Sequence, residues 1–287
     1  MSESTGEGEG ALKVTILGCG SSGGVPRVGG PDGAGDWGAC DPKEPKNRRT
    51  RCSVLVRRRH PERGFAHDAV TAVLVDASPD MREQLLRARC SRLDAVLFTH
   101  DHADQCHGID DLRAFALAQR ARVPVYIDES TGGSIAERFR YCFEQAPDSL
   151  YPPILARRPM PACGAPFQID GPSGPVPVVA FLQHHGGVDS LGFRIGDVAY
   201  SSDVVSLPEE SFEILKGARI WIVDALQYKP HKTHAHLALT LEWIARVKPE
   251  RAILTNLHIH MDYRTLSVEL PPGVEPAYDG MELYGNP

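Results

Sequence analysis

The strongest chemical signal in this chain is the ten-residue segment from Thr99 to Gly108. The apolar run 94–98 before it predicts a short buried strand. His100, His102 and Asp104 then follow at alternate positions. Imidazole and carboxylate groups are ligands that suit zinc, manganese or iron. The segment therefore predicts a metal site at the end of a buried strand.

Short apolar runs alternate with segments of helical pattern along most of the chain, which predicts an α/β protein. Strands are expected at 12–17, 52–56, 71–75, 94–98, 123–127, 178–181, 191–195, 198–200, 220–223 and 251–254. Helices are expected from Pro79 to about Arg89 and at 109–119, 135–143 and 237–247. Residues 150–177 are rich in proline and turn residues, which favours a loop insertion. The runs ending at His100 and Asn256 resemble each other, and we expect two related halves within one domain, 12–287.

Composition restricts the classes of partner and the cellular compartment that we expect for this protein. The net charge of −6 argues against nucleic acid as a partner. No apolar run reaches the roughly 18 residues of a membrane helix. The acidic, small-residue segment 1–11 lacks the pattern of a secretory signal, and it predicts a disordered tail on a cytoplasmic protein. The seven cysteines are scattered without a C-x-x-C pair, which favours reduced thiols.

The segment Thr99–Asp104 resembles the T-H-x-H-x-D-H signature of the metallo-β-lactamase fold. Further matching segments follow in family order, at 17–26, 76–80, 108–113, 185–194, 200–203 and 278–281. Together they are similar to the phosphodiesterase branch that includes phosphoribosyl cyclic phosphate phosphodiesterase. The resemblance implies a four-layer αββα sandwich that holds one or two zinc or manganese ions per chain.

The resemblance also implies roles for individual residues. The metal would be bound by three histidines and an aspartate, namely His100, His102, His185 and Asp203. Asp203 would bridge to a second metal that is held partly by Asp104. Asp76 would orient a ligand from outside the metal site. Catalysis would depend on Asp104 and on His234, which could act as a general acid; a solvated loop is the alternative for His234.

Two positions that bind the second metal in relatives depart from the family pattern. Gln105 and Asn256 stand where relatives have histidines, and a neutral amide oxygen is a weaker ligand. Gln105 could still contribute as a ligand, with Asn256 in the surrounding shell. His258 is a candidate to compensate, and His107 is a poorer one. The pair of changes predicts that the second metal is weakly bound or absent. Cys40 stands alone where relatives build a structural zinc site, so no such site is expected.

The residues together predict a metal-dependent hydrolase that cleaves a small or cyclic phosphodiester with a metal-activated hydroxide. A thioester or lactone hydrolase on the same fold and a catalytically weak metal-binding accessory protein are the alternatives. Four basic residues could hold a substrate phosphate or form an exposed basic loop: Lys46, Arg48, Arg49 and Arg51. We expect a small-molecule substrate and no membrane partner, and a homodimer is compatible with the sequence.

Overall fold

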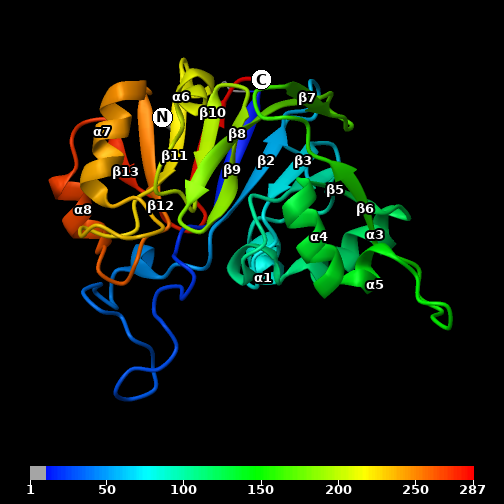
Figure 1. Ribbon diagram of the computed structural model, residues 1–287, viewed down its shortest axis with the longest axis horizontal. Helices are drawn as coiled ribbons and strands as arrows, with labels where there is room; N and C mark the ends of the chain where they lie inside the picture. The colour runs from blue at the N-terminus through cyan, green and yellow to red at the C-terminus, as the bar shows by residue number, and fades with distance from the viewer. Residues whose placement is uncertain (1–10) are drawn as a thin grey trace, which may run out of the picture.

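Two seven-stranded sheets pack face to face in the computed structural model, which describes residues 11–287 (Figure 1). Most of the expected disordered tail, residues 1–10, lies outside the described residues. Apolar side chains from both sheets fill the space between them. A second apolar cluster lies between the first sheet and its helices, and a third lies between the second sheet and its helices. The layer order is therefore helices, sheet, sheet, helices, which confirms the predicted αββα sandwich.

The first sheet contains the N-terminal half of the chain and its last strand. In spatial order its strands are β14 (Glu282–Gly285), β1 (Leu12–Gly18), β2 (Ser53–Arg58), β3 (Thr71–Val75), β4 (Ala95–Leu97), β5 (Val123–Ile127) and β6 (Leu155–Pro159). The pairs on either side of β1 and between β2 and β3 are antiparallel, and those from β3 to β6 are parallel.

The second sheet contains the C-terminal half and repeats this arrangement. Its strands are β13 (Val274–Pro276), β12 (Arg251–Thr255), β11 (Ile220–Asp224), β10 (Val198–Ser201), β9 (Val188–Ile195), β8 (Val176–His185) and β7 (Pro166–Ile169). The pairs from β7 to β10 are antiparallel, and those from β10 to β13 are parallel. The expectation of two related α/β halves agrees with this topology.

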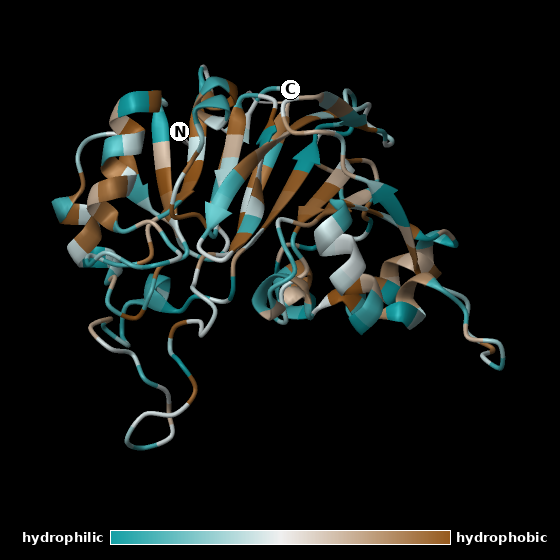
Figure 2. Cartoon of the chain, in the orientation of Figure 1, coloured by the Kyte–Doolittle hydropathy of each residue, from teal (hydrophilic) through white to brown (hydrophobic). Residues whose placement is uncertain are grey.

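Helices cover the outer faces of both sheets. On the first sheet these are α1 (Met81–Arg87), α2 (Ala103–Cys106), α3 (Arg113–Gln119), α4 (Glu129–Arg138) and α5 (Arg140–Phe143), with the 3-10 turn Ile109–Leu112 before α3. On the second they are α6 (Glu209–Leu215), α7 (Leu237–Val247) and α8 (Tyr263–Glu269). Figure 2 shows many hydrophobic residues along the strands and a mixture of hydrophobic and hydrophilic residues on the helices. Within residues 11–287, no helix is long and apolar enough to cross a membrane.

Several expected boundaries were wrong. Residues 150–177 are not a loop insertion, because they contain β6 and β7, one edge strand of each sheet. Their prolines hid both strands, and proline is tolerated at sheet edges. The helix expected at 135–143 begins earlier, because Asp128 caps α4 through the amide of Thr131. The strand expected at 178–181 extends to His185.

The ends of the parallel strands gather polar side chains at one edge of the sandwich. Asp76 follows β3, Asp203 follows β10, and Asn256 follows β12. All three adopt a positive φ, of 63°, 54° and 60°, which is uncommon for residues other than glycine. The segment between β1 and β2, blue in Figure 1, extends beyond this same edge and includes the 3-10 turn Pro45–Asn47.

Candidate metal centre

Three imidazoles from two sheets meet at this edge. His100 lies three residues beyond β4, His102 is the N-cap of α2, and His185 is the last residue of β8. Their ring centroids lie 4.5 to 5.2 Å apart. One nitrogen from each ring lies within 4.8 Å of the others, a spacing that a tetrahedral cation with bonds of about 2 Å can bridge. The structure therefore brings together the three histidines predicted from the sequence.

A hydrogen-bond relay fixes the orientation of His100. Asp76 accepts hydrogen bonds from the backbone amide of Thr99 at 2.8 Å and from its hydroxyl at 3.0 and 3.1 Å. Because the hydroxyl proton is used there, the Thr99 oxygen accepts from Nδ1 of His100 at 2.9 Å. Nε2 of His100 is buried and has no hydrogen-bond partner among residues 11–287. An imidazole with its proton on Nδ1 presents the Nε2 lone pair, as a metal ligand requires.

His185 is oriented in the same way. Its Nδ1 donates to the backbone carbonyl of Thr233 at 2.7 Å, so Nε2 again carries the lone pair. The neighbouring His184 points to the opposite face of β8, as strand alternation requires, and pairs with Asp189 at 2.7 Å. Burial lowers the pKa of His185, and burial lowers that of His100 to about 4. Both rings are therefore neutral near pH 7, which favours metal binding.

Asp203 lies beside these imidazoles. Its Oδ1 atom is 3.9 Å from Nε2 of His185 and 3.9 Å from Nδ1 of His234. Burial opposes its negative charge, but His100, His234 and His185 outweigh burial and hold the pKa of Asp203 below its ordinary value. The three imidazoles suit zinc or manganese and fit one divalent cation, and Asp203 belongs to an overlapping ligand group with His185 and His234.

The side-chain amide of Gln105 lies between the carboxylates of Asp104 and Asp203. Its Nε2 atom donates to Asp203 at 3.0 Å and to Asp104 at 3.2 Å, which uses both of its protons. A second cation bridging the two carboxylates would need the place that this nitrogen fills. The reversed amide would bring its oxygen against two carboxylate oxygens, which is unfavourable. The amide nitrogen therefore joins the two carboxylates, while its Oε1 atom is buried without a hydrogen-bond partner among residues 11–287.

His234 belongs to a second hydrogen-bonded group behind the metal centre. Its Nδ1 donates to the buried carboxylate of Asp224 at 2.8 Å, and Asn256 donates to the same oxygen at 3.2 Å. Burial alone would lower the pKa of His234, but Asp224, Asp203 and Asp104 raise it to about 9. His234, His185 and Asp203 also form a possible ligand group by distance. With Nδ1 engaged by Asp224, the ring is placed as a charged donor beside the centre.

Two predicted candidates lie elsewhere. His258 contacts the guanidinium of Arg27 and lies outside both groups of possible ligands found among residues 11–287. Burial and this cation lower the pKa of His258 to about 4, and the same positive charge would repel a metal ion. His258 therefore does not compensate for Asn256. The ring of His107 packs against Phe139, with centroids 5.5 Å apart.

The basic residues between positions 46 and 51 have structural contacts. Lys46 lies over the rings of Tyr263 and Tyr278, at 4.5 and 4.4 Å from their centroids. Arg49 is buried at 2% exposure, and Arg51 pairs with Asp80 at 2.9 Å. Arg48 remains exposed and lies over the ring of Trp37, so the segment is only in part an exposed basic loop, and three of its four cations contact the rest of the fold.

Sequence reasoning assigned no role to three residues that support this site, although Asp224 stands at a strand end as Asp76 and Asp203 do. Asp224, Thr99 and Thr233 orient His234, His100 and His185 respectively. Asp224 had a detectable signal, because a carboxylate directly follows the buried apolar run 220–223. Thr233 contributes only a backbone carbonyl, which carries no sequence signal.

Comparisons with known proteins agree with this description. Residues 71–259 match the family model of the β-lactamase superfamily domain. The chain is 30% identical to a solved "New Diphosphatase from the PhnP Family", with a TM-score of 0.80 and coverage of 95% of this chain and 97% of that one. The zinc-bound PqqB of Methylobacterium extorquens has the same fold, with a TM-score of 0.69, 19% identity, and coverage of 94% and 99%.

A curated relative has a different name. The octanoyltransferase of Porphyromonas gingivalis is 31% identical over 273 residues, which are 94% of this chain and 51% of that protein. The chain thus spans about half the length of this relative. The family model covers most of the chain, and the PhnP-family structure aligns along nearly all of it. The chain therefore belongs to the β-lactamase superfamily, and within it to the PhnP family.

Proposed function

We propose that this protein is a metal-dependent phosphodiesterase that acts on a small or cyclic phosphodiester and holds one catalytic metal ion. The observation that carries the proposal is the pair of oriented imidazoles. His100 and His185 each have Nδ1 bonded within the protein and Nε2 directed to a common point with His102. The likeness to a PhnP-family diphosphatase supports a phosphate ester as the substrate.

His100, His102, His185 and Asp203 would hold the cation. When bound, such an ion supplies a Lewis acid and lowers the pKa of water toward neutrality. Asp76 and Thr99 keep His100 in the ligating tautomer, and the carbonyl of Thr233 does the same for His185. The protein's own contribution at this point is a set of oriented imidazoles together with the carboxylate of Asp203.

His234 would supply the proton that a leaving alkoxide needs. Its contact with Asp224 keeps the ring charged at neutral pH, and its centroid lies 4.6 Å from that of His185. A general acid at this position contributes about 10²- to 10⁴-fold to the rate for a poor leaving group. Gln105, through its two donated protons, would partly offset the charge of the two carboxylates that a second cation would otherwise balance.

Acyl thioester hydrolysis is the second candidate, favoured by the octanoyltransferase name of the curated relative. A single-metal site can also polarise a thioester carbonyl. The two candidates require the same metal ligands, so only substrate preference separates them.

The test is a substrate panel assayed with the metal-loaded protein: bis(p-nitrophenyl) phosphate, a ribose cyclic phosphate, a cyclic nucleotide and an octanoyl thioester. We expect phosphodiester turnover that is lost with chelator and restored by zinc or manganese. His185→Ala should abolish it, and the matched control His184→Ala should preserve it. Thioester turnover without phosphodiester turnover would replace the proposal with its alternative, and turnover of neither would refute both.

A further inference from the structure

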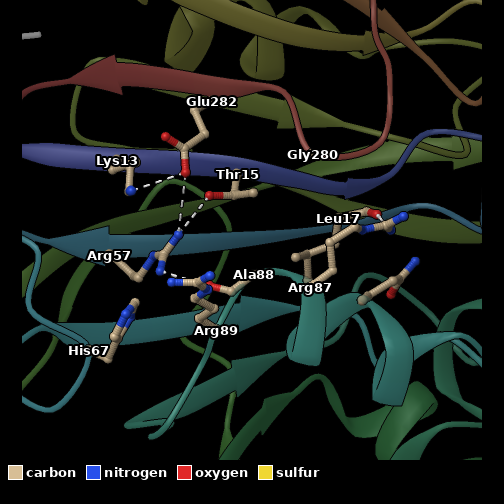
Figure 3. Close-up of a pocket in the computed structure, with 11 residues that line it drawn as sticks. Lys13, Thr15, Leu17, Arg57, His67, Arg87, Ala88, Arg89, Gly280 and Glu282 are labelled. Atoms are coloured by element: carbon tan, nitrogen blue, oxygen red, sulfur yellow. Dashed lines mark hydrogen bonds and ion pairs between the residues drawn. The ribbon is translucent and has the colours of Figure 1, made fainter. Parts of the chain in front are cut away.

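A second concave site lies on the outer face of the first sheet (Figure 3). It is a cavity of about 310 Å³ lined by residues of β1, β2, β14 and the end of α1. Four of the lining side chains are cationic: Lys13, Arg57, Arg87 and Arg89. None of the residues described at the metal centre lines this cavity, so it is a separate site.

Arg57 forms the buried wall of the cavity. The residue is 3% exposed, and its guanidinium donates to the hydroxyl of Thr15 at 3.0 Å and to the carbonyl of Ala88 at 3.1 Å. Its Nε atom is buried without a hydrogen-bond partner among residues 11–287. Its one ionic contact in that range is to Glu282, at 3.8 Å. A buried guanidinium with so little compensation leaves positive potential in the cavity.

The charges around the cavity do not balance. Glu282 is shared between Arg57 and Lys13, the latter at 3.0 Å, as Figure 3 shows. Arg87 contacts Asp279 at 3.4 Å. The side chain of Arg89 has no ionic or hydrogen-bond partner within the described part of the chain. Four cations therefore face two carboxylates, a surplus of two positive charges in a chain of net charge −6.

We propose that this cavity binds a small phosphate-bearing anion. Guanidinium groups bind phosphate through paired, charge-assisted hydrogen bonds, and the exposed Arg89 is free to supply such a pair. The volume is near the lower end of the roughly 300–1,000 Å³ typical of ligand pockets, which favours a mono- or diphosphate over a larger ligand. The proposal does not depend on the activity of the metal centre.

Calorimetric titration of the metal-loaded protein with inorganic pyrophosphate at low salt tests the proposal. His185→Ala is titrated in parallel to separate binding at the metal centre from binding elsewhere, and the arginine variants assign the remainder to the cavity. Arg89→Glu should weaken that binding about tenfold or more, because it replaces a charge-assisted donor with a repelling carboxylate. The matched control Arg122→Glu changes the same charge at an exposed residue outside the cavity, and it should leave the affinity roughly unchanged.

A variant with the opposite expected sign completes the test. Glu282→Gln should tighten pyrophosphate binding several-fold, because it releases Lys13 and Arg57 from their shared carboxylate. Glu282 has a 39% exposed side chain, so the substitution should leave the fold intact. Equal weakening by Arg89→Glu and Arg122→Glu, no gain from Glu282→Gln, or no binding left in His185→Ala would each overturn the proposal.

Discussion

The side-chain nitrogen of Gln105 lies 3.0 Å from the carboxylate of Asp203 and donates its second proton to Asp104 at 3.2 Å. A neutral amide therefore stands between two acidic groups at the place where a bridging cation would have to bind. Burial and the nearby Asp203 raise the pKa of Asp104 to about 6. This contact of Gln105 is the reason for proposing one metal ion per chain rather than two.

Replacing both amides by histidine should create the second metal position. We expect Gln105→His with Asn256→His to raise the zinc or manganese content from about one to about two ions per chain, because imidazole is the better ligand. Elemental analysis after equilibration with metal and desalting measures the ratio. Gln145→His adds an exposed histidine away from the site and should not change it. An unchanged ratio in the double variant would show that the amides do not limit metal binding.

The hydrogen bonds from Asp76 through Thr99 to His100 should increase the affinity for the metal. Thr99→Val removes the hydroxyl that joins Asp76 to His100, and we expect metal affinity to fall about 10- to 100-fold. Competition with a chromophoric chelator measures the dissociation constant. Thr99→Ser should restore most of the affinity. Thr71→Val removes a hydroxyl that contacts the carbonyl of Gly174, far from the site, and it serves as the control. An affinity equal to that of the unaltered protein in Thr99→Val would contradict the role of the relay.

If His234 is the general acid, the effect of replacing it on the hydrolysis rate should depend on the leaving group of the substrate. His234→Gln should slow hydrolysis of an alkyl phosphodiester about 10²-fold or more, with little effect on a p-nitrophenyl ester, whose leaving group needs no proton. Its metal content should stay that of the unaltered protein, because Nδ1 is engaged by Asp224. His231→Gln, at the neighbouring histidine, is the control. Loss of metal from His234→Gln would instead identify His234 as a ligand.

The strand-end histidines and aspartates could be predicted because their signals are local. His100, His102 and Asp104 follow one apolar run, and His185 ends another. The α/β class could be predicted from the alternation of apolar runs, and the four-layer sandwich from the family resemblance. The contact between Arg27 and His258 could not, because it joins residues 231 positions apart through an irregular segment. Likewise β6 and β7 were hidden by prolines that only their edge positions tolerate.

Asp262 should make part of the stability depend on pH. It caps α8 through the amide of Thr265 at 2.9 Å and accepts from Asn47 at 2.6 Å. Although burial opposes the charge, these hydrogen bonds lower its pKa from 3.8 to about 2. A depressed carboxyl pKa gives stability that is present above the unfolded value and lost as pH falls toward 2.

Asp262→Ala should therefore lower the free energy of unfolding by about 1–2 kcal/mol at pH 6, and by progressively less below pH 4. Urea denaturation at several pH values measures the difference. Asp148→Ala, at an exposed residue away from α8, controls for the change in net charge. A difference that stays constant between pH 6 and pH 3 would rule out ionic capping by Asp262.

The most direct test is to titrate the chelator-treated protein with manganese or zinc while hydrolysis of bis(p-nitrophenyl) phosphate is followed. We predict that activity is absent without metal, rises linearly, and saturates at about one ion per chain. His185→Ala should show no recovery, and His184→Ala should recover as the unaltered protein does. Full activity without metal, or saturation only at two ions per chain, would contradict a hydrolase with a single metal and Gln105 in place of the second.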